Sequence, residues 1–377
     1  MPRHDPPTRP SDSPTASPLD RRDFMVRAAG LGLGLAAGVA GSTRAAEPKV
    51  ESRNLIPGNV YRRLGRTNMA VSALAIGGVV LNKERMPVFE AAIDRGLNFV
   101  MAHGGKCAQA LAPWLSQATN RNRIFLGYAG QPKAIDGALS TLKTDCIDLV
   151  MAPIHSPKDA ADQAVADAFA KAKKAGKARY LCLVFHSNVP AVWKAGLEAG
   201  WYDVLLPTYN WASRKTLQPL IAQTRAKDIG LIAMKTLKGI QKNQEPIGTW
   251  KRFLADGIDV IIKGMTRKAE LDRYLALARQ DDTTPPASAS TEGPLGECAL
   301  CGTCTPCPQG VSIQDVMRTW QYYACQLGWR ETARAHFAAI PAPARPTSCA
   351  DCGRCEALCP QHVPIRRLLR EAQQTLV

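Results

Sequence analysis

The sequence predicts an α/β protein in which a (β/α)8 TIM barrel over residues 60–280 precedes a smaller α-helical domain over residues 298–377. Two observations carry this prediction. Short apolar runs alternate with helical segments through the first region, and eight of the twelve cysteines form two compact motifs in the second. Residues 281–297, which are rich in Thr, Pro, Ala and Ser, are expected to link the two domains.

Residues 1–46 resemble a twin-arginine export signal. Arg21 and Arg22 precede a Gly-, Ala- and Leu-rich run at residues 28–41, and residues 43–46 offer small side chains for cleavage. The run is shorter than the ~20 apolar residues of a membrane span. This pattern predicts a periplasmic or otherwise exported protein that the twin-arginine translocase carries. A transit peptide, a plain tail and an uncleaved membrane anchor remain as alternatives.

The barrel prediction rests on strand-like apolar runs separated by helical segments. The runs cover residues 73–78, 97–101, 124–128, 147–152, 180–184, 203–206, 230–234 and 260–263. Eight strand–helix units of this kind close into a barrel, whose catalytic residues lie on the loops after the strands. Side chains directly after each run are therefore the candidates for a functional site.

The C-terminal cysteines have the spacing of ligands to iron–sulfur clusters. The motifs are Cys298-x2-Cys301-x2-Cys304-x2-Cys307 and Cys349-x2-Cys352-x2-Cys355-x3-Cys359, each followed directly by Pro. Ferredoxins use such runs to hold two [4Fe-4S] clusters, and the last cysteine of each run ligates the other cluster. A pair of structural zinc sites is the alternative, but zinc does not require the two Cys-Pro endings.

The usual crossed pattern assigns four thiolates to each cluster. One cluster is expected on Cys298, Cys301, Cys304 and Cys359, and the other on Cys349, Cys352, Cys355 and Cys307. An internal repeat supports this assignment, because residues 307–313 match residues 359–365 at five of seven positions. The first motif is one residue shorter than the bacterial spacing.

The segment between the two motifs predicts helix. Val316, Trp320 and Tyr323 recur at helical spacing, which favours an α-helical ferredoxin-type domain.

The charge of the chain bears on its partners. The 48 Lys and Arg residues exceed the 32 Asp and Glu residues, for a formal charge of +16. A basic surface can attract an acidic redox partner protein or an anionic membrane surface. Nucleic acid is not expected as a partner, because no basic stretch is interleaved with aromatic residues and no DNA-reading motif occurs.

Several motifs in order along residues 60–377 resemble the iron–sulfur branch of the aldo/keto reductase family. They are Leu64-Gly65-Arg66-Thr67, Gly96-Leu97-Asn98-Phe99, Asp145-Cys146-Ile147-Asp148-Leu149, Phe185-His186-Ser187, Ile232-Ala233-Met234-Lys235 and the two cysteine motifs. The resemblance implies a barrel that reduces carbonyl compounds with NADPH. It also implies a catalytic tetrad of Asp, Tyr, Lys and His, in which Tyr protonates the carbonyl oxygen.

This sequence departs from that tetrad at every position. The family's Asp, Tyr, Lys and His fall on Met101, Lys106, Ala129 and Pro153. Without the Tyr there is no evident acid, and without the Lys and Asp nothing lowers the pKa of one. NADPH is therefore not expected as a cofactor, and an exported protein would also lack a supply of it.

Other side chains can take the place of the tetrad at the barrel mouth. The candidates are His103, Lys106, His155 and His186, with Cys107, Tyr128 and Asn210 as neighbours. His103 and His155 each lie two residues beyond a lost family position, and a two-residue step keeps a strand side chain on the same face. Such a site could hold a metal or a flavin. The alternative is that these are polar loop residues in an inert pocket.

These observations favour an exported redox protein that transfers electrons through two [4Fe-4S] clusters to or from a partner protein. The first alternative is an oxidoreductase with a rebuilt barrel site. The others are an NADPH-dependent aldo/keto reductase and a scaffold in which barrel and clusters are structural.

Overall fold

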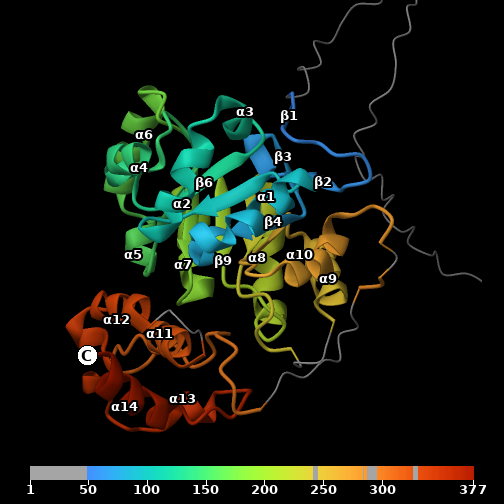
Figure 1. The fold of residues 1–377 in the computed structure, drawn as a ribbon. Helices are drawn as coiled ribbons and strands as arrows, with labels where there is room; N and C mark the ends of the chain where they lie inside the picture. The colour runs from blue at the N-terminus through green and yellow to red at the C-terminus, as the bar shows by residue number, and fades with distance from the viewer. Residues whose placement is uncertain (1–48, 241–244, 283, 287–294, 326–329) are drawn as a thin grey trace, which may run out of the picture. The chain divides into compact units, whose positions relative to one another are not determined.

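The computed structural model describes residues 49–240, 245–282, 284–286, 295–325 and 330–377 (Figure 1). The expected export signal at residues 1–46 lies outside these residues. By its internal contacts, the described chain from residue 49 to the C-terminus falls in one compact unit. No helix in the described ranges is long and apolar enough to cross a membrane.

In the part of the chain that the structure describes, eight parallel strands close into a barrel. They are β4 (Leu74–Gly77), β5 (Phe99–Ala102), β6 (Phe125–Ala129), β7 (Ile147–Pro153), β8 (Ala178–Phe185), β9 (Val204–Pro207), β10 (Gly230–Ala233) and β11 (Val260–Lys263). The barrel closes where β11 pairs with β4, with Ile261 opposite Leu74. Each strand overlaps one of the apolar runs, so the TIM-barrel prediction is confirmed.

Helices surround the barrel strands (Figure 1). They are α1 (Met86–Asp94), α2 (Lys106–Leu115), α3 (Ala118–Arg121), α4 (Ile135–Leu142), α5 (Pro157–Ala160), α6 (Gln163–Lys174), α7 (Val189–Ala199), α8 (Arg214–Ala226), α9 (Pro246–Asp256) and α10 (Lys268–Tyr274). Because successive strand residues face opposite sides, Phe99 and Met101 of β5 join the cluster inside the barrel, whereas Val100 packs against the helices. The core therefore has two layers.

A small sheet covers the end of the barrel at which the strands begin. It contains β1 (Glu51–Ser52), β2 (Tyr61–Arg63) and β3 (Met69–Ser72), in the order β1-β3-β2. Leu64, Met69 and Val71 of this region are fully buried in the inner cluster of the barrel. This packing closes that end, so a cavity can open only where the strands finish.

The C-terminal domain is α-helical, as predicted. Its helices include α11 (Ile313–Cys325), α12 (Arg330–Ala338), α13 (Arg354–Ala357) and α14 (Ile365–Leu376). Val316, Phe337 and Leu369 form part of its buried core, and six of the eight motif cysteines, all but Cys301 and Cys352, pack partly against this core. The helices therefore hold the cysteine loops in place.

Candidate functional site

The first group of cysteines joins Cys359 to the three thiols at the start of the C-terminal domain. Electrostatic interactions connect the thiols of Cys298 and Cys304 with those of Cys301 and Cys359. Burial and, secondarily, these neighbouring thiols raise the pKa of Cys298 to about 11 and also raise the pKa of Cys304. Clustered thiols that disfavour one another's ionisation suit a metal centre, whose positive charge stabilises the thiolates.

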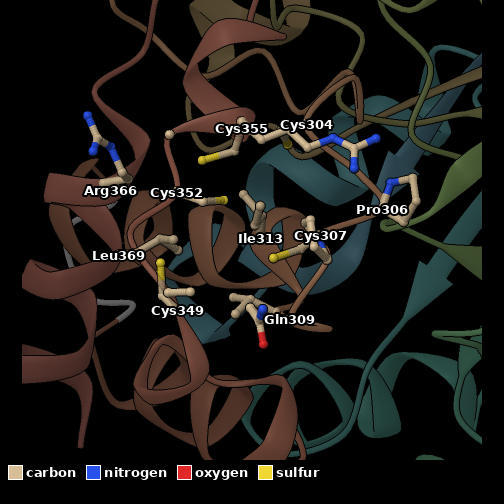
Figure 2. Close-up of a pocket in the computed structure, with 15 residues that line it drawn as sticks. Cys304, Pro306, Cys307, Gln309, Ile313, Cys349, Cys352, Cys355, Arg366 and Leu369 are labelled. Carbon is tan, nitrogen blue, oxygen red and sulfur yellow. The ribbon is translucent and has the colours of Figure 1, made fainter.

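The second group of cysteines lines a small cavity in the C-terminal domain. Figure 2 shows the side chains of Cys307, Cys349, Cys352 and Cys355 around this cavity, together with Cys304 of the first motif. Ile313 and Leu369 contribute apolar walls, and the Cys352 residue is exposed at the surface. Several sulfur donors around one small cavity that reaches the surface fit an iron–sulfur cluster.

The structure thus places the fourth cysteine of each motif with the other motif. Cys359 interacts electrostatically with Cys298 and Cys304, and Cys307 lines the cavity that the second motif forms. These positions are compatible with crossed ligation, but Cys304 of the first motif lines that cavity as well, so the ligand assignment stays a prediction. The donor sets therefore have the composition that two [4Fe-4S] clusters require.

A cavity of about 720 Å³ opens at the end of the barrel where the strands finish. Its barrel walls come from the ends of β4, β5, β8, β10 and β11. The C-terminal domain supplies Cys298, Tyr322 and His336, and the end of the linker supplies Glu297. This volume lies within the ~300 to 1,000 Å³ typical of ligand-binding sites. A ligand of the first cysteine group therefore lies on the wall of a cavity large enough for an organic compound.

The candidate histidines at the barrel mouth separate into two sets. His103 and His186 line the cavity, and His186 Nδ1 lies 3.5 Å from Thr208 Oγ1. His155 and Lys106 are exposed and do not line it. In the described residues, no group of three or more His, Cys, Asp or Glu is placed to hold a single metal ion. A shared metal on His103, His155 and His186 therefore finds no support in the geometry.

The histidines on the cavity wall are held in the neutral form. Burial, and then His336, lower the pKa of His103 to about 4. Burial, and then Arg318, lower the pKa of His336 to about 4 and hold the pKa of His186 well below its usual value. At neutral pH these imidazoles can exchange hydrogen bonds with a ligand, but they carry no charge and no readily released proton.

The expected tetrad positions supply no acid to this cavity. Met101 lines the wall, whereas Ala129 and Pro153 do not. Cys107 is buried beneath His103, whose backbone N–H donates to Cys107 Sγ at 3.3 Å, and burial raises the pKa of this thiol to about 11. Tyr128 also lies off the cavity wall.

Sequence reasoning missed a polar pair on the cavity wall. Lys235, which follows β10, donates from Nζ to the phenolic oxygen of Tyr322 in α11 at 2.6 Å. Lys235 belongs to a motif that resembles the family, but the sequence assigned it no role. Tyr322 gave no signal, because a tyrosine in an amphipathic helix is typical of a core residue.

Comparison with known proteins identifies both domains. The model of the aldo/keto reductase family matches residues 119–251, and the model of the 4Fe-4S dicluster domain matches residues 297–364. A search of curated proteins gave no match.

Two solved structures have a similar barrel. A putative aldo-keto reductase from Pseudomonas aeruginosa is 21% identical with a TM-score of 0.48, and the alignment covers 62% of this chain and 98% of that one. Aldo-keto reductase AKR11C1 from Bacillus halodurans, in its holo form, is 16% identical with a TM-score of 0.50, and the alignment covers 61% of this chain and 93% of that one. At this identity the second likeness establishes the fold alone. The chain therefore joins an aldo/keto reductase-type barrel to a C-terminal 4Fe-4S dicluster domain.

Proposed function

We propose that this chain is an exported iron–sulfur oxidoreductase that moves electrons between a partner protein and a compound held in the barrel cavity. One observation carries the proposal. Cys298, a member of the first cysteine group, lines the same cavity as His103, His186 and Lys235 at the barrel mouth. An electron carrier that used only its surface would not need such a cavity beside a cluster ligand.

The eight cysteines are suited to hold the redox groups. Cys298, Cys301, Cys304 and Cys359 would hold one [4Fe-4S] cluster, and Cys349, Cys352, Cys355 and Cys307 the other. When bound, such clusters supply one-electron transfer. Of the second set, Cys352 is exposed, so this side of the domain is open to a partner protein.

The chain fixes the first cysteine loop against the barrel mouth through consecutive backbone carbonyl groups. Side-chain amides donate from Gln321 to Cys298 at 2.7 Å, from Asn210 to Ala299 at 2.7 Å and from Gln314 to Leu300 at 3.1 Å. Gln314 also accepts from the backbone N–H of Asn188 in the barrel at 2.7 Å. Such anchoring holds Cys298 at a constant place on the cavity wall, as electron exchange with a bound compound requires.

The partners follow from charge and from the N-terminal motif. A formal charge of +16 suits an acidic redox protein or a protein that lies at an anionic membrane surface. Arg21 and Arg22 make the twin-arginine translocase a second partner and the periplasm the expected location. NADPH is not part of this proposal, because the tetrad positions hold Met101, Lys106, Ala129 and Pro153.

Anaerobically purified holoprotein provides the test. Iron and sulfide analysis and electron paramagnetic resonance first establish the cluster content, and dithionite then reduces the clusters. Their reoxidation is followed by absorbance with small carbonyl and quinone compounds.

Two matched substitutions show whether the compound reacts inside the cavity. Val80→Trp places a large side chain on the wall of the cavity and reduces its volume. Glu84→Trp adds the same side chain at a nearby exposed position that does not line the cavity. Slower reoxidation in Val80→Trp alone supports the proposal. Equal reoxidation in both variants and the wild type would favour a carrier that reacts only at its surface.

A further inference from the structure

Lys235 and Tyr322 form a buried polar pair that joins the two domains on the cavity wall. The Nζ atom of Lys235 lies 2.6 Å from Tyr322 Oη and 4.3 Å from the centroid of the Tyr322 ring. Both residues line the cavity, and Tyr322 is only 6% exposed. The barrel thus contributes the ammonium group, and the cluster domain contributes the phenol.

The backbone of Lys235 adopts a left-handed conformation, with φ of 59°. For a residue other than glycine this conformation costs about 1 to 3 kcal/mol and is frequent at functional sites. The strained residue follows Met234, which forms an isolated bridge with Thr208 beyond the regular ends of β9 and β10. The turn places the Lys235 side chain at the mouth of the barrel, where it meets α11.

Arg318 adds a second positive charge to the pair. Its guanidinium lies 5.6 Å from the centroid of the Tyr322 ring, donates to Asp315 Oδ1 at 2.9 Å and lies 3.0 Å from His336 Nδ1. Asp315 also accepts from Ser312 Oγ at 2.9 Å, which fixes the carboxylate. These contacts hold the guanidinium beside the phenol.

The charges around Tyr322 favour its ionised form. Burial alone would raise the pKa of the phenol, but Lys235 and Arg318 lower it below its usual value. The titratable and charged groups near the pair are Lys235 and Lys238 after β10, Asp315 and Arg318 on α11, His336 on α12, His186 after β8 and Lys263 of β11. Glu297, Glu270 and Arg273 line the same cavity. The imidazoles are neutral, and Asp315 is paired with Arg318. Lys235 and Arg318 are thus the cations that lie against the Tyr322 ring, at 4.3 and 5.6 Å from its centroid.

Among the described residues on the cavity wall, Tyr322 is better suited to donate a proton than the phenol of Tyr274, because burial raises the pKa of Tyr274 whereas the two neighbouring cations lower that of Tyr322. The imidazoles of His103, His186 and His336 are neutral at physiological pH, and a neutral imidazole gives up its N–H proton far less readily than a phenol. A phenol whose anion is stabilised by two cations can release its proton and later recover it.

We propose, resting on the function proposed above, that Tyr322 is the catalytic proton donor of the barrel cavity and that the compound bound there carries a carbonyl-type oxygen, as a quinone does. The oxygen gains negative charge when the compound accepts an electron from a one-electron donor. The O–H bond of Tyr322 then breaks, and the proton forms a new O–H bond on that oxygen. Lys235 and Arg318 neutralise the phenolate, and water in the cavity returns the proton. Conversion of a quinone to its hydroquinone takes two electrons and two protons in total.

This arrangement gives the C-terminal domain a role besides electron transfer. The acid lies on α11, and its charge partner Lys235 lies after β10, so the acid is assembled only when the two domains are in contact. The family's tetrad residues are expected at the ends of β5, β6 and β7, where this chain lacks them. The proposed acid lies instead beside the end of β10, on the other side of the barrel mouth.

The first test measures the ionisation of Tyr322 in the oxidised holoprotein. Tyrosine labelled with ¹³C at Cζ is titrated by NMR, and the Tyr322→Phe variant identifies the signal. We expect a midpoint below the ordinary value of ~10. Lys235→Met should shift the midpoint upward, and Lys235→Arg should leave it low. A midpoint of ~10 or above in the wild type would overturn the assignment without any measurement of activity.

The second test measures proton-coupled electron transfer. Dithionite-reduced holoprotein is mixed with duroquinone, which takes up protons, or with ferricyanide, which does not. Tyr322→Phe should slow duroquinone reduction about 100-fold, within the range for loss of a general acid, and leave ferricyanide reduction unchanged. Tyr323→Phe is the matched control, because Tyr323 stacks on Trp320 and does not line the cavity.

The outcomes separate this inference from the function on which it rests. If Val80→Trp slows duroquinone reduction but Tyr322→Phe does not, the cavity is the site of reaction and Tyr322 is not its acid. If neither substitution slows it, both proposals are wrong. If both substitutions slow it and Tyr323→Phe does not, both are supported.

Discussion

The side-chain amide of Asn210 donates a hydrogen bond of 2.7 Å to the carbonyl oxygen of Ala299. Asn210 follows β9 and is fully buried, and Ala299 is the residue after Cys298. The Asn210 Oδ1 atom also accepts from the backbone N–H of Ser213 at 3.2 Å, which fixes the orientation of the amide. The barrel thereby sets the position of the first cysteine loop.

Loss of this amide donor should make the first cluster labile. In Asn210→Asp the carboxylate can still accept from Ser213 but cannot donate, so the buried carbonyl of Ala299 loses its partner. An unsatisfied buried group costs about 1 to 3 kcal/mol. We expect faster loss of the first cluster's signal when the anaerobic holoprotein is exposed to an iron chelator. Ser213→Ala leaves the bond to Ala299 in place and should lose both clusters at the wild-type rate.

Crossed ligation predicts that cysteines distant along the chain affect the same cluster. Cys355 and Cys359 are four residues apart but are expected to ligate different clusters, and Cys359 interacts electrostatically with Cys298 and Cys304. Cys359→Ser should therefore alter the same cluster as Cys301→Ser, and Cys355→Ser should alter the same cluster as Cys307→Ser. Electron paramagnetic resonance of each variant checks the pairing. Matching spectra for Cys355→Ser and Cys359→Ser would instead indicate uncrossed ligation.

The barrel and the cysteine groups could be predicted because both depend on local patterns. A nearly continuous apolar run such as residues 147–152 is typical of a strand in a parallel sheet that is covered on both faces. The strand β7 (Ile147–Pro153) forms there. The two Cys-Pro endings indicate two clusters through spacing alone. In both cases a few neighbouring residues contain the information.

The barrel-mouth site was harder to predict because it depends on contacts between distant residues. Lys235 and Tyr322 are 87 positions apart, on two domains. Trp320 and Tyr323, which recur at helical spacing, are only half-buried, and Tyr322 is the enclosed aromatic residue. The helix α11 packs against α12 and α14 and also reaches the barrel, so one apolar stripe cannot describe its buried surface.

The expectation that residues two positions apart point to the same side failed beyond the strand ends. His103 directly follows β5 and lines the cavity, whereas β7 ends at Pro153 and His155 lies two residues beyond it, exposed. Alternation of side chains applies only while the backbone remains extended.

NADPH should not support ordinary aldehyde reduction by this protein. Met101, Lys106, Ala129 and Pro153 at the tetrad positions provide neither the phenol nor its lysine and aspartate partners there. We expect turnover well below the ~1 per second at the lower end of ordinary enzymes, measured by loss of NADPH absorbance with an aromatic aldehyde. A tetrad-bearing aldo/keto reductase serves as the positive control. Comparable turnover by the two proteins would favour the NADPH-dependent alternative.

Export should depend on the two adjacent arginines of the N-terminal segment. Arg21→Lys together with Arg22→Lys keeps the charge but removes the paired guanidinium groups that are expected to be recognised. We expect the double variant to accumulate in the cytoplasm with its clusters assembled, as judged by cell fractionation and absorbance. Arg3→Lys with Arg9→Lys, which changes two arginines outside the motif, is the control. Normal export of the Arg21 and Arg22 double variant would contradict the twin-arginine assignment.

Asp148 should make the stability of the barrel sensitive to acid. This residue of β7 is 1% exposed and accepts from Arg53, Arg121 and Arg179, with the closest contact, 2.6 Å, to Arg179 Nη1. Burial alone would raise the pKa of the carboxyl group, but Arg121, Arg53 and Arg179 hold it below the usual value. Because the folded pKa is lower than the unfolded one, the stabilisation is complete above the unfolded pKa of about 4. It is lost as the pH falls through the folded pKa.

We therefore expect Asp148→Asn to be destabilising at pH 7, since it removes the only carboxylate among the described residues that pairs with Arg121 and leaves Arg53 and Arg179 with Glu51 alone. Breaking a fully buried ion pair costs about 3 to 5 kcal/mol, which is the upper bound for this partly exposed network. The difference in the free energy of unfolding between the variant and the wild type should stay constant from pH 7 to pH 5 and narrow below about pH 4. Thermal unfolding of both anaerobic holoproteins, followed by circular dichroism, measures the gap. Acid damage to the clusters is common to the two proteins and cancels in the difference. Asp136→Asn, which removes an exposed ion pair with Lys177, is the control and should change stability little at any pH. A gap for Asp148→Asn that widened on acidification would contradict the assignment of a lowered pKa.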